Sequence, residues 1–202
     1  MVINLAAGLD ARPYRLKLPS DLRWVEVDVE DLIAQKEDLL KDEKPVCHLE
    51  RYCLNLVDRA ARHILLRELS QGAKRAVIVT EGLMMYLNPD DVRSLAIELA
   101  ASNTFRSWIL DLFHPRLLGA NRRGKIGRML AQANAQFRFA PAEGPAFFES
   151  CGWRCAHVES TLKAAVRTGR GPLIVRLLLP IFERPSAKGG YSWSGVALLE
   201  AK

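Results

Sequence analysis

Cysteine is scarce in this chain, and its few copies are not arranged for cross-linking or metal binding. The four cysteines form no Cys-x-x-Cys pair, whereas a disulfide-stapled scaffold of this length would be denser in cysteine. The segment CGWRC at 151–155 finds no pair of His or Cys elsewhere that would complete four ligands. We therefore predict reduced thiols and no metal site.

Long apolar runs are also missing. The longest one, at 172–182, contains Arg176 and falls short of the roughly 18 residues that span a bilayer. No signal-peptide pattern opens the sequence either. We therefore expect a cytoplasmic protein with no membrane partner.

Charge of both signs is present but unevenly divided. Residues 1–101 carry a net charge of −3 and residues 102–202 a net charge of +9. The densest basic patch, at 116–128, indicates either a solvated helix face, which we favour, or a surface for nucleic acid or an anionic substrate. Because no aromatic residue interrupts the patch to stack on bases, we expect no nucleic-acid partner.

Strand and helix patterns alternate along most of the chain. The apolar periodicity, helix caps and turn residues predict strands at 2–6, 23–29, 45–54, 76–80 and 107–113, and helices at 31–41, 58–69 and 89–101. Beyond these, the pattern predicts a basic helix at 115–136, a short helix at 145–150 and strands at 153–159 and 192–200. The alternation predicts one α/β domain over 1–202, with a doubly wound, Rossmann-like, mainly parallel sheet and an antiparallel C-terminal edge strand.

Polar residues follow the first four predicted strands. Because ligands bind beyond the carboxyl ends of parallel strands, these residues mark the expected site. Asp28 comes 20 residues after Gly8, the spacing at which an acid meets a ribose in nucleotide-binding sheets. Asn55 with Leu56 follows the third strand, and Glu81 follows the fourth.

The turn at 6–11 is poor in glycine, and this shortage constrains the ligand. A dinucleotide site uses G-x-G-x-x-G to bring backbone amides to phosphate, whereas the turn here reads A-A-G-L-D-A. The ATP-type loop G-x-x-x-x-G-K-[ST] is absent. S-adenosylmethionine has no phosphate and carries a positive sulfonium and ammonium, so an acidic strand edge suits it better.

Four segments in order carry a family resemblance: VINLAAGLDARPYRL at 2–16, WVEVDVEDLIAQK at 24–36, LNL at 54–56 and TEGLMMYL at 80–87. Together they resemble the leucine carboxyl methyltransferase family of S-adenosylmethionine-dependent enzymes, and most closely its bacterial branch similar to tetracenomycin polyketide synthesis O-methyltransferase. The resemblance runs from residue 2 to about 100. It implies the class I methyltransferase fold and S-adenosylmethionine as cofactor, with S-adenosylhomocysteine as product.

The resemblance also implies a role for each matching residue. Ala6, Ala7 and Gly8 would lie against the methionine part of the cofactor, and Glu81 would approach its amino-acid end. Taken singly, each residue fits an ordinary turn residue or surface carboxylate better than a cofactor contact. The functional interpretation rests on all four segments in order.

The adenosine end of the cofactor would meet the later segments. Asp28 would bind the ribose diol, and Asn55 and Leu56 would meet the adenine ring through an amide and the backbone. Asp10 and Arg15 would fix the loop by hydrogen bonds.

Three departures from the family pattern bear on activity. Ala6 replaces the first glycine, which strains the turn if its φ is positive. Asn55 replaces an Asp and so offers adenine an uncharged acceptor. The family also places a helical cap segment before the first strand, and the sequence given starts at the strand, so we expect that cap to be missing. An exposed patch left by the missing cap would favour a homodimer.

The expected reaction is methyl transfer to a small-molecule hydroxyl or to a carboxylate. A carboxylate needs no general base, while a hydroxyl usually does. No catalytic residue is predicted, since His114 is the one histidine placed to be a base and we favour an ordinary loop histidine beside Pro115. Two alternatives remain: a cofactor-binding regulatory homologue without turnover, and a nucleic-acid methyltransferase, which lacks the expected [DN]-P-P-[YF] motif.

Overall fold

The computed structural model describes residues 1–113, 115, 136–170 and 194–202. Its contacts divide the chain into two compact units, one formed by Met1–Leu83 with Glu98–Ile109 and the other by Met84–Ile97 with Leu110–Lys202. The predicted basic helix at 115–136 falls almost entirely outside the described residues, as do the basic patch at 116–128 and His114.

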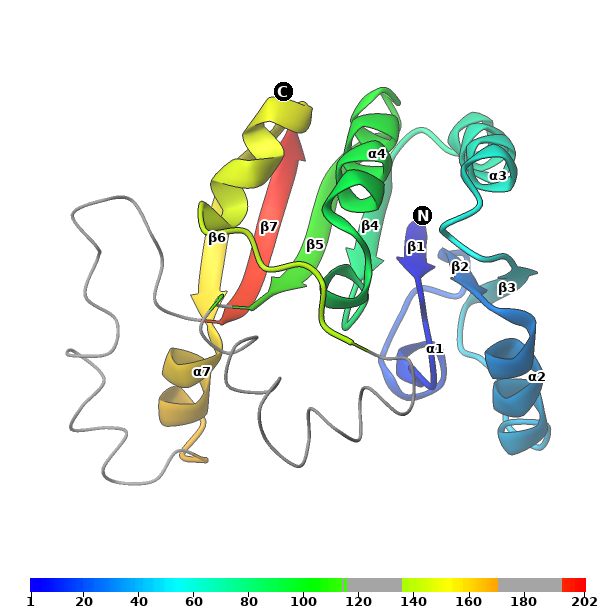
Figure 1. Cartoon of the computed structure of the whole chain (residues 1–202). Helices are drawn as coiled ribbons and strands as arrows, with labels where there is room; N and C mark the ends of the chain where they lie inside the picture. The colour runs from blue at the N-terminus through cyan, green and yellow to red at the C-terminus, as the bar shows by residue number, and fades with distance from the viewer. Residues whose placement is uncertain (114, 116–135, 171–193) are drawn as a thin grey trace. The chain divides into compact units, whose positions relative to one another are not determined.

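Parallel strands form the centre of the first unit (Figure 1). The strand β1 pairs in parallel with β2 on one side and with β4 on the other, and β2 pairs in parallel with β3. Strand order therefore reverses beside β1, which is where open parallel sheets bind their ligands. These elements span Val2–Leu5 (β1), Arg23–Asp28 (β2), His48–Cys53 (β3) and Ala76–Thr80 (β4).

The prediction of β4 is confirmed to the residue, while β3 starts later than predicted. The run Ala76–Thr80 is rich in β-branched residues and mostly buried, which gives a strand clear limits. The predicted strand at 45–54 instead begins at His48, because the Val46 N–H donates to Pro13 O at 2.8 Å and so belongs to a connection.

Helices link these strands at the predicted places. The helix α3, Arg59–Gln71, begins after Asp58, whose carboxylate accepts from the N–H groups of Ala60 and Ala61 at 3.1 Å. It ends at Gly72, as predicted. A short helix that was not predicted, α1, occupies Arg12–Arg15 directly after the first loop.

The helix α2, Glu30–Leu39, was predicted from the helical spacing of Leu32, Ile33, Leu39 and Leu40, and of these only Ile33 is buried. Leu32 is 37% exposed and Leu39 is 61% exposed. The buried side chains are Ile33 and Lys36, and Lys36 Nζ lies 2.7 Å from a carboxylate oxygen of the buried Glu26. An apolar side chain and a buried ion pair therefore both contribute to the buried side of α2.

The second unit contains an antiparallel strand pair, as predicted for the C-terminal part. The strands β6, Trp153–Ser160, and β7, Gly195–Ala201, pair antiparallel. A 3-10 helix, η2, covers Gly144–Cys151 at the predicted short helix and ends at Gly152, whose φ is +95°. The helix α7, Thr161–Arg167, was not predicted, although Ser160 caps it through the Lys163 N–H.

Two elements cross the boundary between the units. The helix α4, Pro89–Ala100, has proline and acids in its first turn, and the strand β5 spans Phe105–Leu112. The short 3-10 helix η1, Met84–Tyr86, contains the buried Met84 and Met85. The hydrogen-bonded strand order is β3-β2-β1-β4-β5-β7-β6, which confirms a mainly parallel α/β sheet with an antiparallel pair at its C-terminal end.

None of the helices within the described ranges is long and apolar enough to cross a membrane.

Candidate functional site

The loop after β1 has an unusual backbone conformation. Ala6 has a φ of +58° and is the one non-glycine residue with positive φ in the described part of the chain. The N–H groups of Ala6 and Ala7 both donate to Val27 O, at 2.8 Å and 3.3 Å, and so hold the loop against the end of β2. Positive φ brings the alanine methyl close to the backbone and costs about 1–2 kcal/mol. Strain in this turn was expected only if the φ of Ala6 were positive. The φ is positive, so the strain is present.

Asp28 joins the ends of the first two strands. Its Oδ2 accepts from the Gly8 N–H at 2.7 Å, and its Oδ1 accepts from the Val29 N–H at 2.8 Å. Asp28 is 7% exposed, so the carboxylate is held on the protein side by two backbone donors. Each carboxylate oxygen has a second lone pair, which leaves Asp28 able to accept from a ligand hydroxyl.

Charged side chains form a chain of contacts across the ends of β1 and β4. Asp10 accepts from Asn4 Nδ2 at 2.9 Å and from Arg12 Nε at 2.8 Å. The other end of the Arg12 guanidinium donates to Glu81. Arg12 therefore bridges one carboxylate in the first loop and another after β4. The side chain of Glu81 stays 54% exposed in this arrangement.

These residues surround a cavity of about 550 Å³. Its lining comes from the end of β1, the first loop, α1 and the residue after β4, and consists of Asn4, Ala6, Ala7, Asp10, Arg12, Arg15 and Glu81. The cavity has both carboxylates and guanidinium groups on its wall, and the loop backbone lies against it. A zwitterionic amino-acid group suits such a wall, because it brings an ammonium and a carboxylate together.

Asn55 and Leu56 lie at the end of β3 and do not line this cavity. The Asn55 Oδ1 accepts from the Val57 N–H at 3.1 Å, which forms a turn. Leu56 is buried, and its carbonyl accepts from Arg62 Nη1 at 2.7 Å. Arg62 is itself 2% exposed and places a second N–H on Glu98 at 2.6 Å.

The structure thus brings most of the predicted residues together. Ala6, Ala7 and Glu81 share the cavity, and the Asp28 carboxylate is bonded to Gly8 beside it. Asn55 and Leu56 stand apart, on a neighbouring connection.

Two residues that line the cavity, Arg12 and Asn4, were not predicted as site residues. Arg12, rather than Arg15, makes the ion pairs that fix the loop, while Arg15 lines the cavity with an exposed side chain. Asn4 is 2% exposed and supports Asp10. The signal for Asn4 was a polar residue inside an otherwise apolar strand, and the signal for Arg12 was its place two residues after Asp10.

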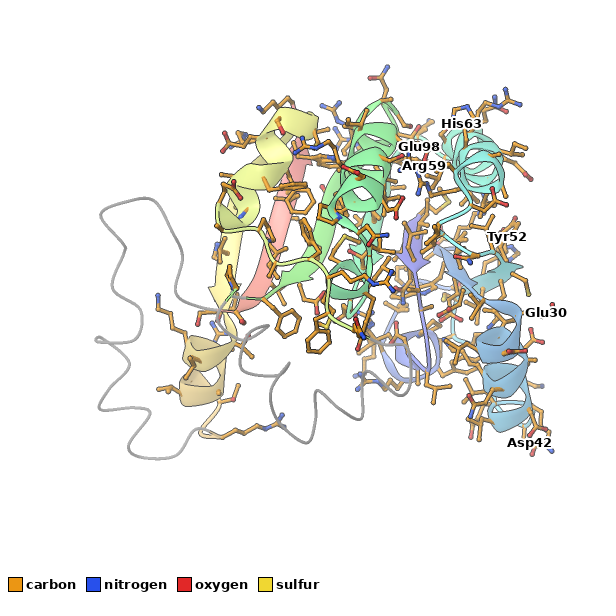
Figure 2. All side chains as sticks on the ribbon, in the orientation of Figure 1. Glu30, Asp42, Tyr52, Arg59, His63 and Glu98 are labelled. Carbon is orange, nitrogen blue, oxygen red and sulfur yellow. The ribbon has the colours of Figure 1, made fainter. Side chains whose placement is uncertain are left out.

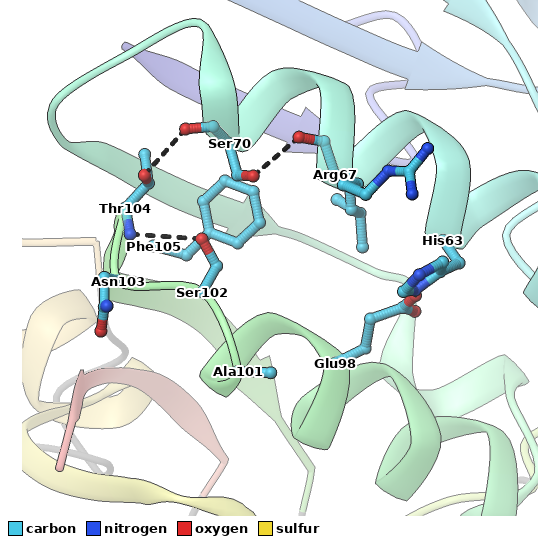
Figure 3. A pocket seen from close by; sticks show the side chains of 10 residues that line it. His63, Arg67, Ser70, Glu98, Ala101, Ser102, Asn103, Thr104 and Phe105 are labelled. Carbon is cyan, nitrogen blue, oxygen red and sulfur yellow. Dashed lines mark hydrogen bonds and ion pairs between the residues drawn. The ribbon is translucent and has the colours of Figure 1, made fainter.

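A second cavity, of about 310 Å³, lies where β5 begins and contains none of the predicted site residues. His63 on α3 and Glu98 on α4 face each other there, with His63 Nδ1 at 2.9 Å from a Glu98 oxygen (Figures 2 and 3). Serine and threonine side chains bond to nearby backbone in the same wall, as Figure 3 shows for Ser70 and Ser102.

Among residues 1–113, 115, 136–170 and 194–202, no group of three or more His, Cys, Asp and Glu is arranged to hold a metal ion. The four cysteines are free thiols.

Solved structures share the fold over the whole chain. A DUF574 family protein from Streptomyces avermitilis matches with a TM-score of 0.66 at 13% identity, covering 100% of this chain and 75% of that one. An S-adenosylmethionine-dependent methyltransferase from Anabaena variabilis matches with a TM-score of 0.60 at 11% identity, covering 100% and 76%. The fold is that of the class I methyltransferases.

The sequence narrows this class to a family. Residues 1–100 match the model of the leucine carboxyl methyltransferase family. This part of the chain contains the first loop, Asp28, Asn55 and Glu81, and it belongs to the leucine carboxyl methyltransferase family.

Named relatives are similar over 45% to 81% of the chain. An S-adenosyl-L-methionine-dependent methyltransferase of Gibberella zeae is 33% identical over 108 residues, covering 52% of this chain and 34% of its own length. Tetracenomycin polyketide synthesis O-methyltransferase of Streptomyces glaucescens is 29% identical over 91 residues, covering 45% and 31%. A Parafrankia relative is 28% identical over 175 residues, covering 81% and 54%. The chain spans at most about half the length of these relatives.

Proposed function

We propose that the chain, as a single domain, binds S-adenosylmethionine at the carboxyl ends of β1, β2, β3 and β4 and transfers its methyl group to an oxygen of a small molecule. The observation that carries the proposal is the Asp28 carboxylate, which holds the Gly8 amide at 2.7 Å beside a cavity walled by charged groups. Family membership and the class I fold support the same site.

The methionine end of the cofactor fits the 550 Å³ cavity by charge. Asp10 and Glu81 offer carboxylate oxygens to its ammonium, and Arg15 offers a guanidinium to its carboxylate. Ala6 and Ala7 bring the backbone to the same wall with only methyl side chains. A pyrophosphate would meet two carboxylates here, so this cavity disfavours a dinucleotide.

The adenosine end fits the neighbouring strand ends. The free lone pairs of the Asp28 carboxylate would accept the two ribose hydroxyls. Asn55 and the backbone at Leu56 would meet the edge of the adenine ring, at the carboxyl end of the next strand. The Asn55 amide already accepts one backbone N–H, so its contribution to adenine binding is expected to be small.

The bound cofactor supplies an electrophilic methyl group on sulfur for in-line displacement. The residues of this chain contribute binding and alignment, which lower the barrier by holding the acceptor oxygen and the methyl in line. A carboxylate acceptor is ionised at neutral pH and needs no base from the protein, whereas a hydroxyl acceptor does. The name of the Streptomyces glaucescens relative supports oxygen as the acceptor atom. A cytoplasmic location is part of the same proposal.

The test is a calorimetric titration with S-adenosylhomocysteine, followed by a screen for transfer of a radiolabelled methyl group to hydroxyl and carboxylate acceptors. We expect binding of one equivalent and transfer to oxygen. Absence of binding would refute the proposed site. Binding without transfer to any acceptor would instead support a regulatory protein that has kept the cofactor site.

A further inference from the structure

Charged residues of β2, α2 and β3 form a connected cluster around a buried glutamate. Glu26 on β2 is 0% exposed, and its two carboxylate oxygens contact Lys36 Nζ at 2.7 Å and Arg51 Nε at 3.0 Å. Lys36 is also 0% exposed. None of these three residues lines the proposed cofactor cavity.

The cluster reaches the loop through one side chain. Arg51 Nη2 donates to the Tyr14 hydroxyl at 2.7 Å. Tyr14 lies on α1, which follows the loop directly and contains Arg12, the residue that bridges Asp10 and Glu81. The position of α1 therefore decides where the Arg12 guanidinium stands.

The buried charges in this link are expected to fix an orientation more than to add stability. A buried ion pair is often no more stable than apolar residues of the same volume, because desolvation offsets the attraction. Charged groups instead restrict orientation, because the planar Arg51 guanidinium can bond to Glu26 and Tyr14 at the same time only in one orientation. A backbone hydrogen bond also links α1 to the connection before β3, since the Val46 N–H donates to Pro13 O at 2.8 Å.

We propose that Arg51 and Tyr14 are positioning residues for the cofactor loop: the Arg51–Tyr14 hydrogen bond anchors α1 to the buried Glu26–Lys36 pair and thereby sets the Arg12 bridge. This inference rests on the proposed cofactor site for its binding readout. A second readout, the mobility of the loop in the free protein, is independent of any ligand.

The same two strands provide a matched control. Arg23 on β2 pairs with Glu50 on β3 through two contacts, Nε to Oε1 at 2.7 Å and Nη2 to Oε2 at 2.8 Å. The Tyr52 hydroxyl donates to Glu50 Oε2 at 3.1 Å. This cluster also combines an arginine, a glutamate and a tyrosine, and its hydrogen bonds described above lie within β2 and β3 rather than reaching α1.

The experiment compares Tyr14→Phe and Arg51→Lys with the controls Tyr52→Phe and Arg23→Lys. The dissociation constant of S-adenosylhomocysteine is measured by calorimetry, and the thermal midpoint is measured for each variant. We expect roughly fivefold weaker binding for Tyr14→Phe and Arg51→Lys, the size of one typical hydrogen bond, and less than twofold for the controls. The double variant should bind no more weakly than Arg51→Lys alone, because both changes remove the same link.

Hydrogen exchange of the ligand-free protein completes the test. In Tyr14→Phe the amide hydrogens of residues 6–10 should exchange several-fold faster than in the unsubstituted protein. In Tyr52→Phe their exchange rates should be unchanged. Equal losses of binding in all four variants, or unchanged exchange at 6–10 in Tyr14→Phe, would overturn the proposal. If the unsubstituted chain fails to bind S-adenosylhomocysteine, the proposed function is refuted, and the exchange comparison alone then decides whether Tyr14 positions the loop.

Discussion

Two cavities lie at opposite ends of the strands in the first unit, and their walls are built differently. At the amino end, where β5 begins, polar side chains satisfy nearby backbone: the Thr104 hydroxyl donates to Ser70 O at 2.9 Å, and Ser102 Oγ accepts from the Thr104 N–H at 3.2 Å. At the carboxyl end, Ala6 has a left-handed backbone conformation and Glu81 keeps a half-exposed carboxylate.

The difference separates residues that hold the fold from residues available to a ligand. At the amino end, the hydrogen bonds of Ser70, Ser102 and Thr104 join nearby segments of backbone. The carboxyl end instead combines backbone strain with charged groups around a larger cavity, a combination that is kept where the surrounding structure and a function require it. We therefore place the ligand site at the carboxyl end.

The largest expected effect comes from Arg62, which connects the two ends. Arg62→Met removes the donors to Glu98 and to the Leu56 carbonyl, and leaves both acceptors without that partner. Breaking a buried charged pair in this way should lower the free energy of unfolding by about 3 kcal/mol. Urea unfolding measures it. A loss below 1 kcal/mol would show that the two ends are not tied through this side chain.

Asp28 tests the carboxyl end directly. In the proposed site the Asp28 carboxylate accepts the ribose hydroxyls. Asp28→Asn keeps the size of the side chain but removes its charge, so S-adenosylhomocysteine should bind about 50-fold more weakly, or roughly 2.3 kcal/mol. The matched change at the amino end is Asn103→Ala in the other cavity, which should alter binding less than twofold. Equal losses of binding in the two variants would contradict the assignment of the ligand site to the carboxyl end.

Ala6 and Ala7 offer a contrast of sign within one loop. Ala6→Gly relieves the positive φ and should raise the free energy of unfolding by about 1 kcal/mol. Ala7→Gly removes a buried methyl at a residue without positive φ, and should lower it by about 1 kcal/mol. Chemical denaturation of both variants, side by side, measures the contrast. Destabilisation by Ala6→Gly would contradict the strained conformation.

The smallest expected effect concerns a charged pair with no part in the ligand site. The hydrogen bond from Arg23 lowers the pKa of Glu50 below its usual value. A lowered pKa in the folded state means that the contribution is present above the unfolded pKa and is lost as pH falls through the folded value. Glu50→Gln should therefore reduce stability by about 0.5 kcal/mol at pH 7 and by less near pH 3. Thermal unfolding from pH 3 to pH 7 measures this, and a difference that grows toward acid would be the wrong sign.

The sequence predicted the sheet because its strands are continuous apolar runs bounded by turn residues. Ala76–Thr80 is the clearest case. The sequence was less informative where tertiary contacts override the apolar pattern. Of the apolar residues at helical spacing in α2, Ile33 is buried while Leu32 and Leu39 are exposed, and Lys36 takes a buried position beside Glu26. No periodicity rule places a lysine in a core.

The candidate site was also predictable only in part. The position of Asp28 relative to Gly8 could be predicted from spacing, because parallel strands bring their carboxyl ends together. The φ of Ala6 could not, since both signs were compatible with the sequence. Nor could the choice of Arg12 over Arg15 as the bridge, which depends on where α1 begins.

The most direct test of ligand binding at the carboxyl end is hydrogen exchange measured with and without S-adenosylhomocysteine. Bound ligand should slow exchange in segments 6–16, 28–30, 55–57 and 80–82, and leave segment 98–105 at the other cavity unchanged. Protection confined to 98–105, or no protection in segment 6–16 at saturating ligand, would contradict the site proposed here.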